Sequence, residues 1–161
     1  MPRLETLSEI LRQVLLTFPC LENDTTPWTP MRHDLSHSKL ALVTTAGLHL
    51  RSDTPFISDP QGGDASYRLL PVTAKAQEIV QSHVSIGFDH TAIYRDLNVT
   101  LPIERLQELV RQGVVGSLAQ QHYSFMGAIR NPPRRVMQET GPEVAQRLQD
   151  EGVEVVLLTP T

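Results

Sequence analysis

The amino-acid sequence predicts an α/β protein with three layers, in which helices cover both faces of a mainly parallel sheet. The last stretch, 152–161, is a glycine followed by a run of valine and leucine, which is typical of a strand buried on both faces. Residues 142–151 before it have helical spacing and begin with proline, so helix and strand form half of a βαβ unit. A second apolar run, 40–43, leads into a turn of small residues.

The chain divides into an N-terminal amphipathic helix (1–18), a connecting arm (19–38) and an α/β domain (39–161). Seven apolar residues of the first helix recur at helical spacing, from Leu4 to Phe18. We expect this stripe to pack on the core of its own domain, with a partner's groove as the alternative. The elements predicted with bounds are helices over 3–17, 102–112 and 142–151 and strands over 40–45 and 153–158.

Composition excludes several classes of protein. A length of 161 residues fits one domain, and a formal net charge of -4 argues against non-specific nucleic-acid binding. No apolar run approaches the roughly 20 residues of a membrane span. The single cysteine, Cys20, allows no intrachain disulfide, so we expect a reducing cytoplasm.

The turn after the first strand is a candidate ligand site. Residues 44–47 are Thr-Thr-Ala-Gly, and small residues after a parallel strand let a ligand or another backbone approach closely. Thr45 and Gly47 are therefore candidate substrate contacts. His49 and Arg51 follow, and they either reach the same edge of the sheet or lie on the surface.

The densest polar stretch runs from Ser82 to Asn98. The alternation of apolar residues from Val84 to Phe88 predicts a strand that carries His83 toward the following loop. Histidine and aspartate side chains there can transfer protons, bind a metal or simply tie down a turn. Their spacing matches no standard zinc pattern, so we expect no metal, and a metal-dependent hydrolase is only a third possibility. His122 and Tyr123 form a second cluster of polar side chains before Gly127.

Several sequence words carry a resemblance to a known family. They are Gly-Leu-His-Leu-Arg-Ser-Asp-Thr-Pro-Phe at 47–56, Gly-Asp-Ala-Ser-Tyr-Arg at 63–68, a longer match from 90 to 113, and His-Tyr-Ser-Phe-Met-Gly at 122–127. Through them, residues 27–161 resemble the selenoprotein B subunits of the glycine, sarcosine and betaine reductases and the related D-proline reductase selenoprotein.

The resemblance implies an oxidoreductase that cleaves a C–N bond reductively, with a disulfide-type acceptor. In that family, a strand resembling Val-Val-Leu-Leu-Thr-Pro-Thr is followed at once by selenocysteine or cysteine. We therefore expect the nucleophile directly after Thr161, and a chain truncated before it, for example because a UGA codon was read as stop. The family also implies a pyruvoyl group on a partner subunit, a dithiol electron donor, other reductase subunits and an oligomer. A non-catalytic interaction module, or a subunit of a larger complex, is the alternative.

From chemistry and position we assign the candidate roles within this frame. The candidate catalytic residues, which would move protons or orient the substrate, are His83, His90, Asp96 and His122. The candidate substrate contacts are Thr45, Gly47, His49, Arg51, Asp89, Asn98, Tyr123, Thr159 and Thr161. The chain itself contributes no cofactor, and without the nucleophile its own activity is an open question.

Overall fold

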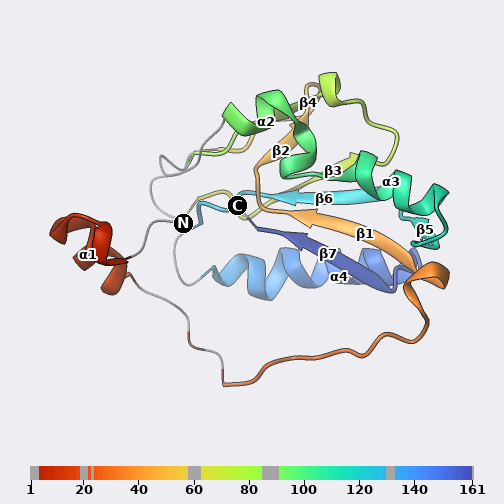
Figure 1. Cartoon of the computed structure of the whole chain (residues 1–161), viewed down its shortest axis with the longest axis horizontal. Helices are drawn as coiled ribbons and strands as arrows, with labels where there is room; N and C mark the ends of the chain where they lie inside the picture. Colours follow the sequence, from red (N-terminus) through yellow and green to blue (C-terminus); the bar gives the residue numbers. More distant parts are fainter. Residues whose placement is uncertain are drawn as a thin grey trace.

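A computed structural model describes residues 4–18, 22, 24–57, 63–84, 91–129 and 133–160. Its main feature is a five-stranded sheet with helices on each face (Figure 1). This arrangement confirms the predicted three-layer α/β architecture. Among the residues described, no helix is both long and apolar enough to cross a membrane.

Strand β1 (Lys39–Thr44) is the centre of the sheet. It pairs in parallel with β5 (Ser117–Leu118), β6 (Gln121–Phe125) and β7 (Val155–Thr159). The remaining strand, β3 (Tyr67–Pro71), runs antiparallel to β6, so the sheet is mainly parallel, as predicted. Both strands predicted with bounds are present, shifted by one or two residues.

The two faces of the sheet have different cores. Helix α4 (Gly141–Asp150) covers one face, and α3 (Ile103–Arg111) with the short α2 (Thr91–Arg95) covers the other (Figure 1). Side chains alternate along β1, so Ala41 lies in the core under α4 and Leu42 in the core under α3. The apolar stripes of α3 and α4 thus pack on opposite faces of the sheet.

Glycines end the two long helices of the domain. Gly113 and Gly152 follow α3 and α4 with φ of 73° and 74°, a conformation that side chains with a Cβ rarely adopt. Both stop signals are confirmed, and the predicted bounds of these helices are right to within one residue.

A second, two-stranded sheet stands beside the main one. Strands β2 (Leu48–Leu50) and β4 (Ile79–Gln81) pair antiparallel, and a 3-10 turn at Ala76–Glu78 directly precedes β4. The strand predicted from Val84 to Phe88 falls almost entirely on residues 85–90, outside the described residues. In the described part of the chain, β4 is the strand that leads toward His83.

The expectation that the terminal strand is buried on both faces is wrong for this chain. Among the described residues, β7 pairs only with β1, and Val156, Leu157 and Leu158 are 40%, 38% and 65% exposed. An apolar run shows that a strand has two apolar faces, but burial also depends on what lies beyond its outer edge.

The N-terminal helix does not pack as expected. Helix α1 (Glu9–Leu16) follows a 3-10 turn at Leu4–Thr6, and all eight of its residues are exposed. The arm that follows is exposed and irregular over residues 24–34. The prediction that the stripe packs on its own core is therefore wrong for this arrangement of the chain.

Candidate active site

The carboxyl ends of three parallel strands meet at one edge of the main sheet. Thr44 at the end of β1 is in register with Ser124 of β6 and with Thr159 of β7. A bridge between Ala46 and Met126 extends the edge beyond the strands. Ligands of open α/β sheets bind at such an edge, so it is the candidate active site. The carboxyl edge is defined here as residues 44–47, 124–127 and 159–160.

Hydrogen bonds from two directions fix the end of β7. The Thr44 hydroxyl donates to the carbonyl of Thr159 (3.2 Å), and the Thr45 N–H donates to the same oxygen (3.3 Å). From the other side, the Thr159 hydroxyl donates to the carbonyl of Thr100 (2.8 Å). These bonds set the direction in which the chain leaves the strand.

The small-residue turn admits another backbone, as its sequence predicts. Gly47 has a φ of 64°, and a Cβ built on it would lie 3.1 Å from the backbone nitrogen of His83. The Gly47 N–H donates to the carbonyl of Phe125 (2.9 Å), and its carbonyl accepts from the N–H of Ser82 (2.9 Å). A larger residue at 47 would push the His83 segment off the edge.

His83 is the candidate catalytic residue that lies beside this turn, and its side chain is buried. Asp89, His90 and Thr161 fall outside the described residues, so their positions are not assigned. The candidate residues that the structure brings together at the carboxyl edge are Thr45, Gly47, His83 and Thr159.

His49 and Arg51 make contacts within the small sheet and its loop. The Nδ1–H of His49 donates to the carbonyl of Leu50 (2.7 Å), and Nε2 accepts from the Ser82 hydroxyl (2.7 Å). Arg51 is exposed, and its Nε donates to the carbonyl of Gln77 (2.8 Å). Since both nitrogens of His49 are engaged, this residue ties the segment before His83 to β2.

His122 is inside the sheet rather than at the carboxyl edge. Its Nδ1 accepts a hydrogen bond from the N–H of Leu42 (3.1 Å), at the level where β5 ends and β6 begins beside β1. The side chain is fully buried, and burial lowers its pKa to about 4. His122 is therefore neutral at pH 7 and takes the place of a backbone acceptor.

Tyr123 points to the opposite face of β6, into the core under α4. Its ring packs against Tyr67 with centroids 5.7 Å apart, and burial raises the pKa of its phenol. The structure therefore gives Tyr123 a packing role on the α4 face.

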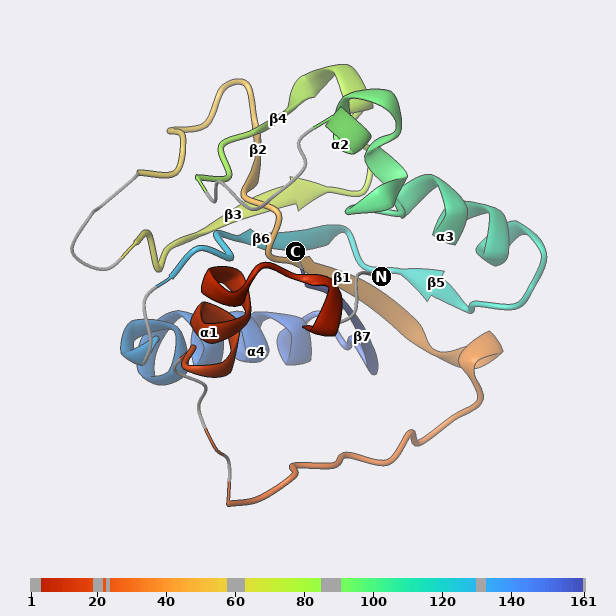
Figure 2. The same cartoon turned by 60° about the vertical axis from the view of Figure 1, so that its left-hand side comes forward.

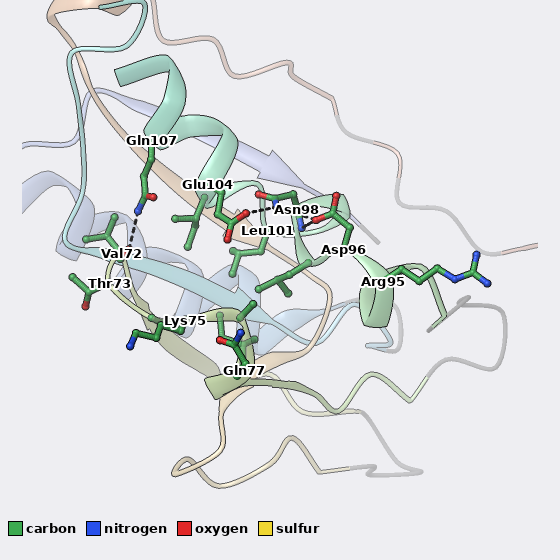
Figure 3. Close-up of a pocket in the computed structure, with 15 residues that line it drawn as sticks. Val72, Thr73, Lys75, Gln77, Arg95, Asp96, Asn98, Leu101, Glu104 and Gln107 are labelled. Carbon is green, nitrogen blue, oxygen red and sulfur yellow. Dashed lines mark hydrogen bonds between the residues drawn. The ribbon is translucent and has the colours of Figure 1, made fainter. Parts of the chain in front are cut away.

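Asp96 and Asn98 form a hydrogen-bonded turn beside a cavity of about 490 Å³ between α3 and residues 72–79 (Figure 3). Asp96 accepts hydrogen bonds from the backbone N–H and from the side-chain amide of Asn98, each at 2.9 Å. The hydrogen bond from the side-chain amide lowers the pKa of the Asp96 carboxyl. Asn98 also donates to Glu104 (3.1 Å). Because Thr100 follows this turn, the turn links the cavity to the end of β7.

Two residues that position the edge were not singled out from the sequence. The Ser124 hydroxyl accepts from the N–H of Leu48 (2.8 Å), and the carbonyl of Thr100 receives the Thr159 hydroxyl. Alternation along β6 from His122 would have placed Ser124 on the α3 face. No three His, Cys, Asp or Glu side chains within the described ranges are grouped closely enough to hold a metal ion.

Comparison with known proteins decides the family. The model of the family "glycine/sarcosine/betaine reductase selenoprotein B" matches residues 15–161. The chain belongs to this selenoprotein B family. D-proline reductase subunit gamma of Acetoanaerobium sticklandii is 36% identical over 132 residues, which are 82% of this chain and 52% of that protein.

Two further relatives are components of reductase complexes. The sarcosine reductase complex component B subunit beta of Peptoclostridium acidaminophilum is 27% identical over 146 residues, 89% of this chain and 33% of that protein. The glycine reductase complex component B subunit gamma of Symbiobacterium thermophilum is 27% identical over 151 residues, with the same coverage of 89% and 33%. The chain thus spans a third to a half of these relatives. No solved structure matches it.

The selenoprotein B match contains the whole described sheet and carboxyl edge. It begins at residue 15, so only the last two residues of α1 fall within it. The carboxyl edge therefore lies within the matched region, whereas most of α1 lies outside it.

Proposed function

We propose that this chain carries the strand end at which a selenol- or thiol-dependent reductase of the selenoprotein B type places its nucleophile. The observation that carries the proposal is the fixed end of β7, which Thr44, Thr45 and Thr100 hold by hydrogen bonds. In the complete subunit, selenocysteine or cysteine would follow Thr161. A reactive group placed one step beyond a fixed strand starts from a defined direction, which favours attack in one geometry.

The proposed reaction is the reductive cleavage of a C–N bond. The selenolate attacks the carbon beside the activated amine; a C–Se bond forms, and the amine leaves with a proton. A neighbouring cysteine thiol then attacks selenium, the carbon leaves with a proton as the reduced product, and a selenenylsulfide remains. An external dithiol reduces the selenenylsulfide and becomes a disulfide, which restores the selenol and thiol.

A partner subunit would activate the amine. The family implies that a pyruvoyl carbonyl on that partner supplies this activation. The relatives are named as subunits of multi-component reductases, which supports the same need for partners here. Among the described residues β7 pairs only with β1, and its outer edge is a surface suited to such an assembly.

The roles proposed for individual residues follow their positions. His83, with His90, would exchange protons with the leaving amine, while Asp96 and Asn98 would hold the turn next to Thr100. His122 would act as a positioning residue, because its buried imidazole bonds to Leu42 inside the sheet and not to the carboxyl edge. Thr45, Gly47 and Thr159 would line the substrate, and Asp89 and Thr161 would complete this lining. His49, Arg51 and Tyr123 would support these contacts from outside.

The first test is the codon that follows Thr161 in the source gene. TGA, with a cysteine codon a few positions later in the same frame, supports the proposal, whereas TAA or TAG would exclude it. The longer protein, with cysteine in place of selenocysteine, is then purified with its associated subunits. We expect dithiol oxidation that depends on one amine among glycine, sarcosine, betaine and D-proline, and none from a variant with alanine in place of that cysteine.

A non-catalytic interaction module is the second candidate. The exposed edge and faces of β7 favour it, because an uncharged apolar strand is a ready surface for pairing. An ordinary stop codon after Thr161, together with a stable complex that contains only the 161-residue form, would establish this function instead.

A further inference from the structure

An apolar groove opens at the carboxyl edge, on the face of the sheet that α4 covers. Its volume is about 560 Å³, and Thr45 and Gly127 of the carboxyl edge form part of its wall. Leu158 of β7 points to the same face and is 65% exposed. The remaining lining is mostly apolar and includes Val43, Phe125, Met126, Val144 and Val156.

Helix α1 carries an exposed apolar stripe. Ile10, Leu11, Val14 and Leu15 are each more than half exposed, whereas Glu9 on the polar side accepts hydrogen bonds from the helix's own arginine and glutamine. A helix of eight residues has little stability by itself in water. An apolar surface that accepts the stripe would stabilise both the helix and the residues it covers.

The arm brings α1 to the end of the sheet where the groove opens. In Figure 1, α1 lies beyond the arrowheads of β1 and β7, and in Figure 2, which turns that side forward, it lies in front. The His33 ring, 2.6 Å from the Glu154 carboxylate, fixes the arm near the start of β7. The sixteen residues from Thr17 to Arg32 can span roughly 50 Å when extended, so the groove is within reach of the chain's own helix.

Charges at the two surfaces are complementary. The acidic Glu5 lies just before the helix, whereas Glu9 is already paired with Arg12 inside the helix (3.4 Å). The groove wall contains Pro133, and the next two residues are the exposed Arg134 and Arg135, of which Arg135 is paired with Glu139 (3.2 Å). Opposite charges at the rim favour docking of the helix with its acidic end toward Arg134.

We propose that α1 is a lid that folds onto this groove and closes the carboxyl edge. The apolar stripe would cover Val156 and Leu158, and the helix would lie over the strand end that precedes the proposed nucleophile. Closure would exclude water from that position, as lids do in other enzymes. This proposal rests on the proposed function, because the lid covers the edge assigned to the reductase. Closure of the lid is measured without catalytic turnover, so either proposal can fail while the other holds.

Limited trypsin digestion tests the lid, because Arg12 lies inside α1 and is protected only while the helix is docked. Docking would bury the exposed half of Leu11 and of Leu15, which together amount to about one leucine side chain. We therefore expect the double variant Leu11→Ser, Leu15→Ser to be cleaved after Arg12 about tenfold faster than the wild-type chain, since burying one leucine is worth about that factor. The groove variant Val156→Ser, Leu158→Ser should show the same increase. The control Glu9→Ser, Gln13→Ser changes the polar side and should be cleaved at a rate close to wild type. All residues of α1 are exposed, so these substitutions leave the buried core of the domain intact. Equal rates in all forms would overturn the proposal.

A disulfide identifies which copy of the chain supplies the helix. Val156→Cys is combined with Leu11→Cys or with Leu15→Cys in a Cys20→Ser background, and the protein is oxidised when dilute. A crosslink within the monomer supports the lid. Crosslinked dimers would overturn it in favour of a second copy on the groove, and the absence of any crosslink, with unchanged trypsin rates, would overturn docking altogether.

Discussion

The two outer strands of the main sheet contrast in how they end it. Strand β3 contains Arg68 and Pro71, residues that natural proteins use to discourage further pairing. Arg68 also donates to the carbonyls of Thr54 and Pro55 and lies 4.3 Å above the ring of Phe56, so a loop covers this side. Strand β7 is Val-Val-Leu-Leu-Thr, without a charge or a proline. One edge of the sheet is closed by its own sequence, and the other is suited to a further partner.

The two strands are also attached to the sheet by different interactions. Leu70 of β3 is fully buried in the core, whereas Leu158 of β7 is mostly exposed. The end of β7 is fixed instead by the hydrogen bonds of Thr159 to β1 and to Thr100. Burial therefore dominates the stability of one edge, and polar contacts position the other.

The largest effect is expected from truncating the same residue type in each edge strand. Leu70→Ala removes a fully buried side chain and should lower the free energy of unfolding by about 2–5 kcal/mol. Leu158→Ala, made in the Leu11→Ser, Leu15→Ser background in which α1 does not dock, should change it by no more than about 0.5 kcal/mol, because the side chain is then in water. Urea denaturation of both variants measures the difference. Equal losses would mean that β7 is buried in solution, which would contradict the contrast between the edges.

The next effect concerns β6, which joins the β3 edge to β1. The pKa of His122 is about 4 in the folded chain and about 6.5 when unfolded, so the unfolded chain binds more protons between these values. The contribution of neutral His122 is complete above pH 6.5 and is lost as pH falls through 4, a change of about 3 kcal/mol. Urea midpoints measured from pH 7 to pH 4 test this expectation.

A variant separates His122 from the other titrating groups. His122→Asn keeps a side-chain acceptor for the Leu42 N–H but cannot be protonated in this range, so most of the pH dependence should disappear. His37→Asn, at an exposed position, should retain it. If both variants keep the full pH dependence, His122 is not the group responsible.

Much of the fold follows from local sequence patterns. The alternation and length of apolar runs predict β1, α3 and α4, and Gly113 and Gly152 mark the helix ends because a positive φ favours glycine. The burial of β7 cannot be predicted from its own sequence, because burial depends on which segments pack against the strand. The apolar stripe of α1 likewise predicts that it packs, but not on which surface.

The candidate site is predictable only in part. Thr45, Gly47 and Thr159 follow from the rule that parallel strands present their carboxyl ends to ligands. The structure also brings His83 to this edge, through the close approach of its backbone to Gly47. His49 and His122 have the chemistry of catalytic residues, yet Nε2 of His49 bonds to Ser82 and Nδ1 of His122 bonds to Leu42, on segments distant in sequence. Sequence spacing does not reveal such contacts.

The smallest effect expected is at the fixed end of β7. Thr159→Val keeps the shape of the side chain but removes the hydroxyl that donates to the Thr100 carbonyl, so we expect a loss of about 1 kcal/mol in stability. Thr29→Val, in the exposed arm, is the matched control and should cost almost nothing. Hydrogen exchange gives the sharper measurement, because the Thr45 N–H donates to the Thr159 carbonyl and should exchange faster only in the first variant. Unchanged exchange at Thr45 would mean that β1 alone fixes the strand end, and Thr100 would then have no part in positioning the residue that follows it.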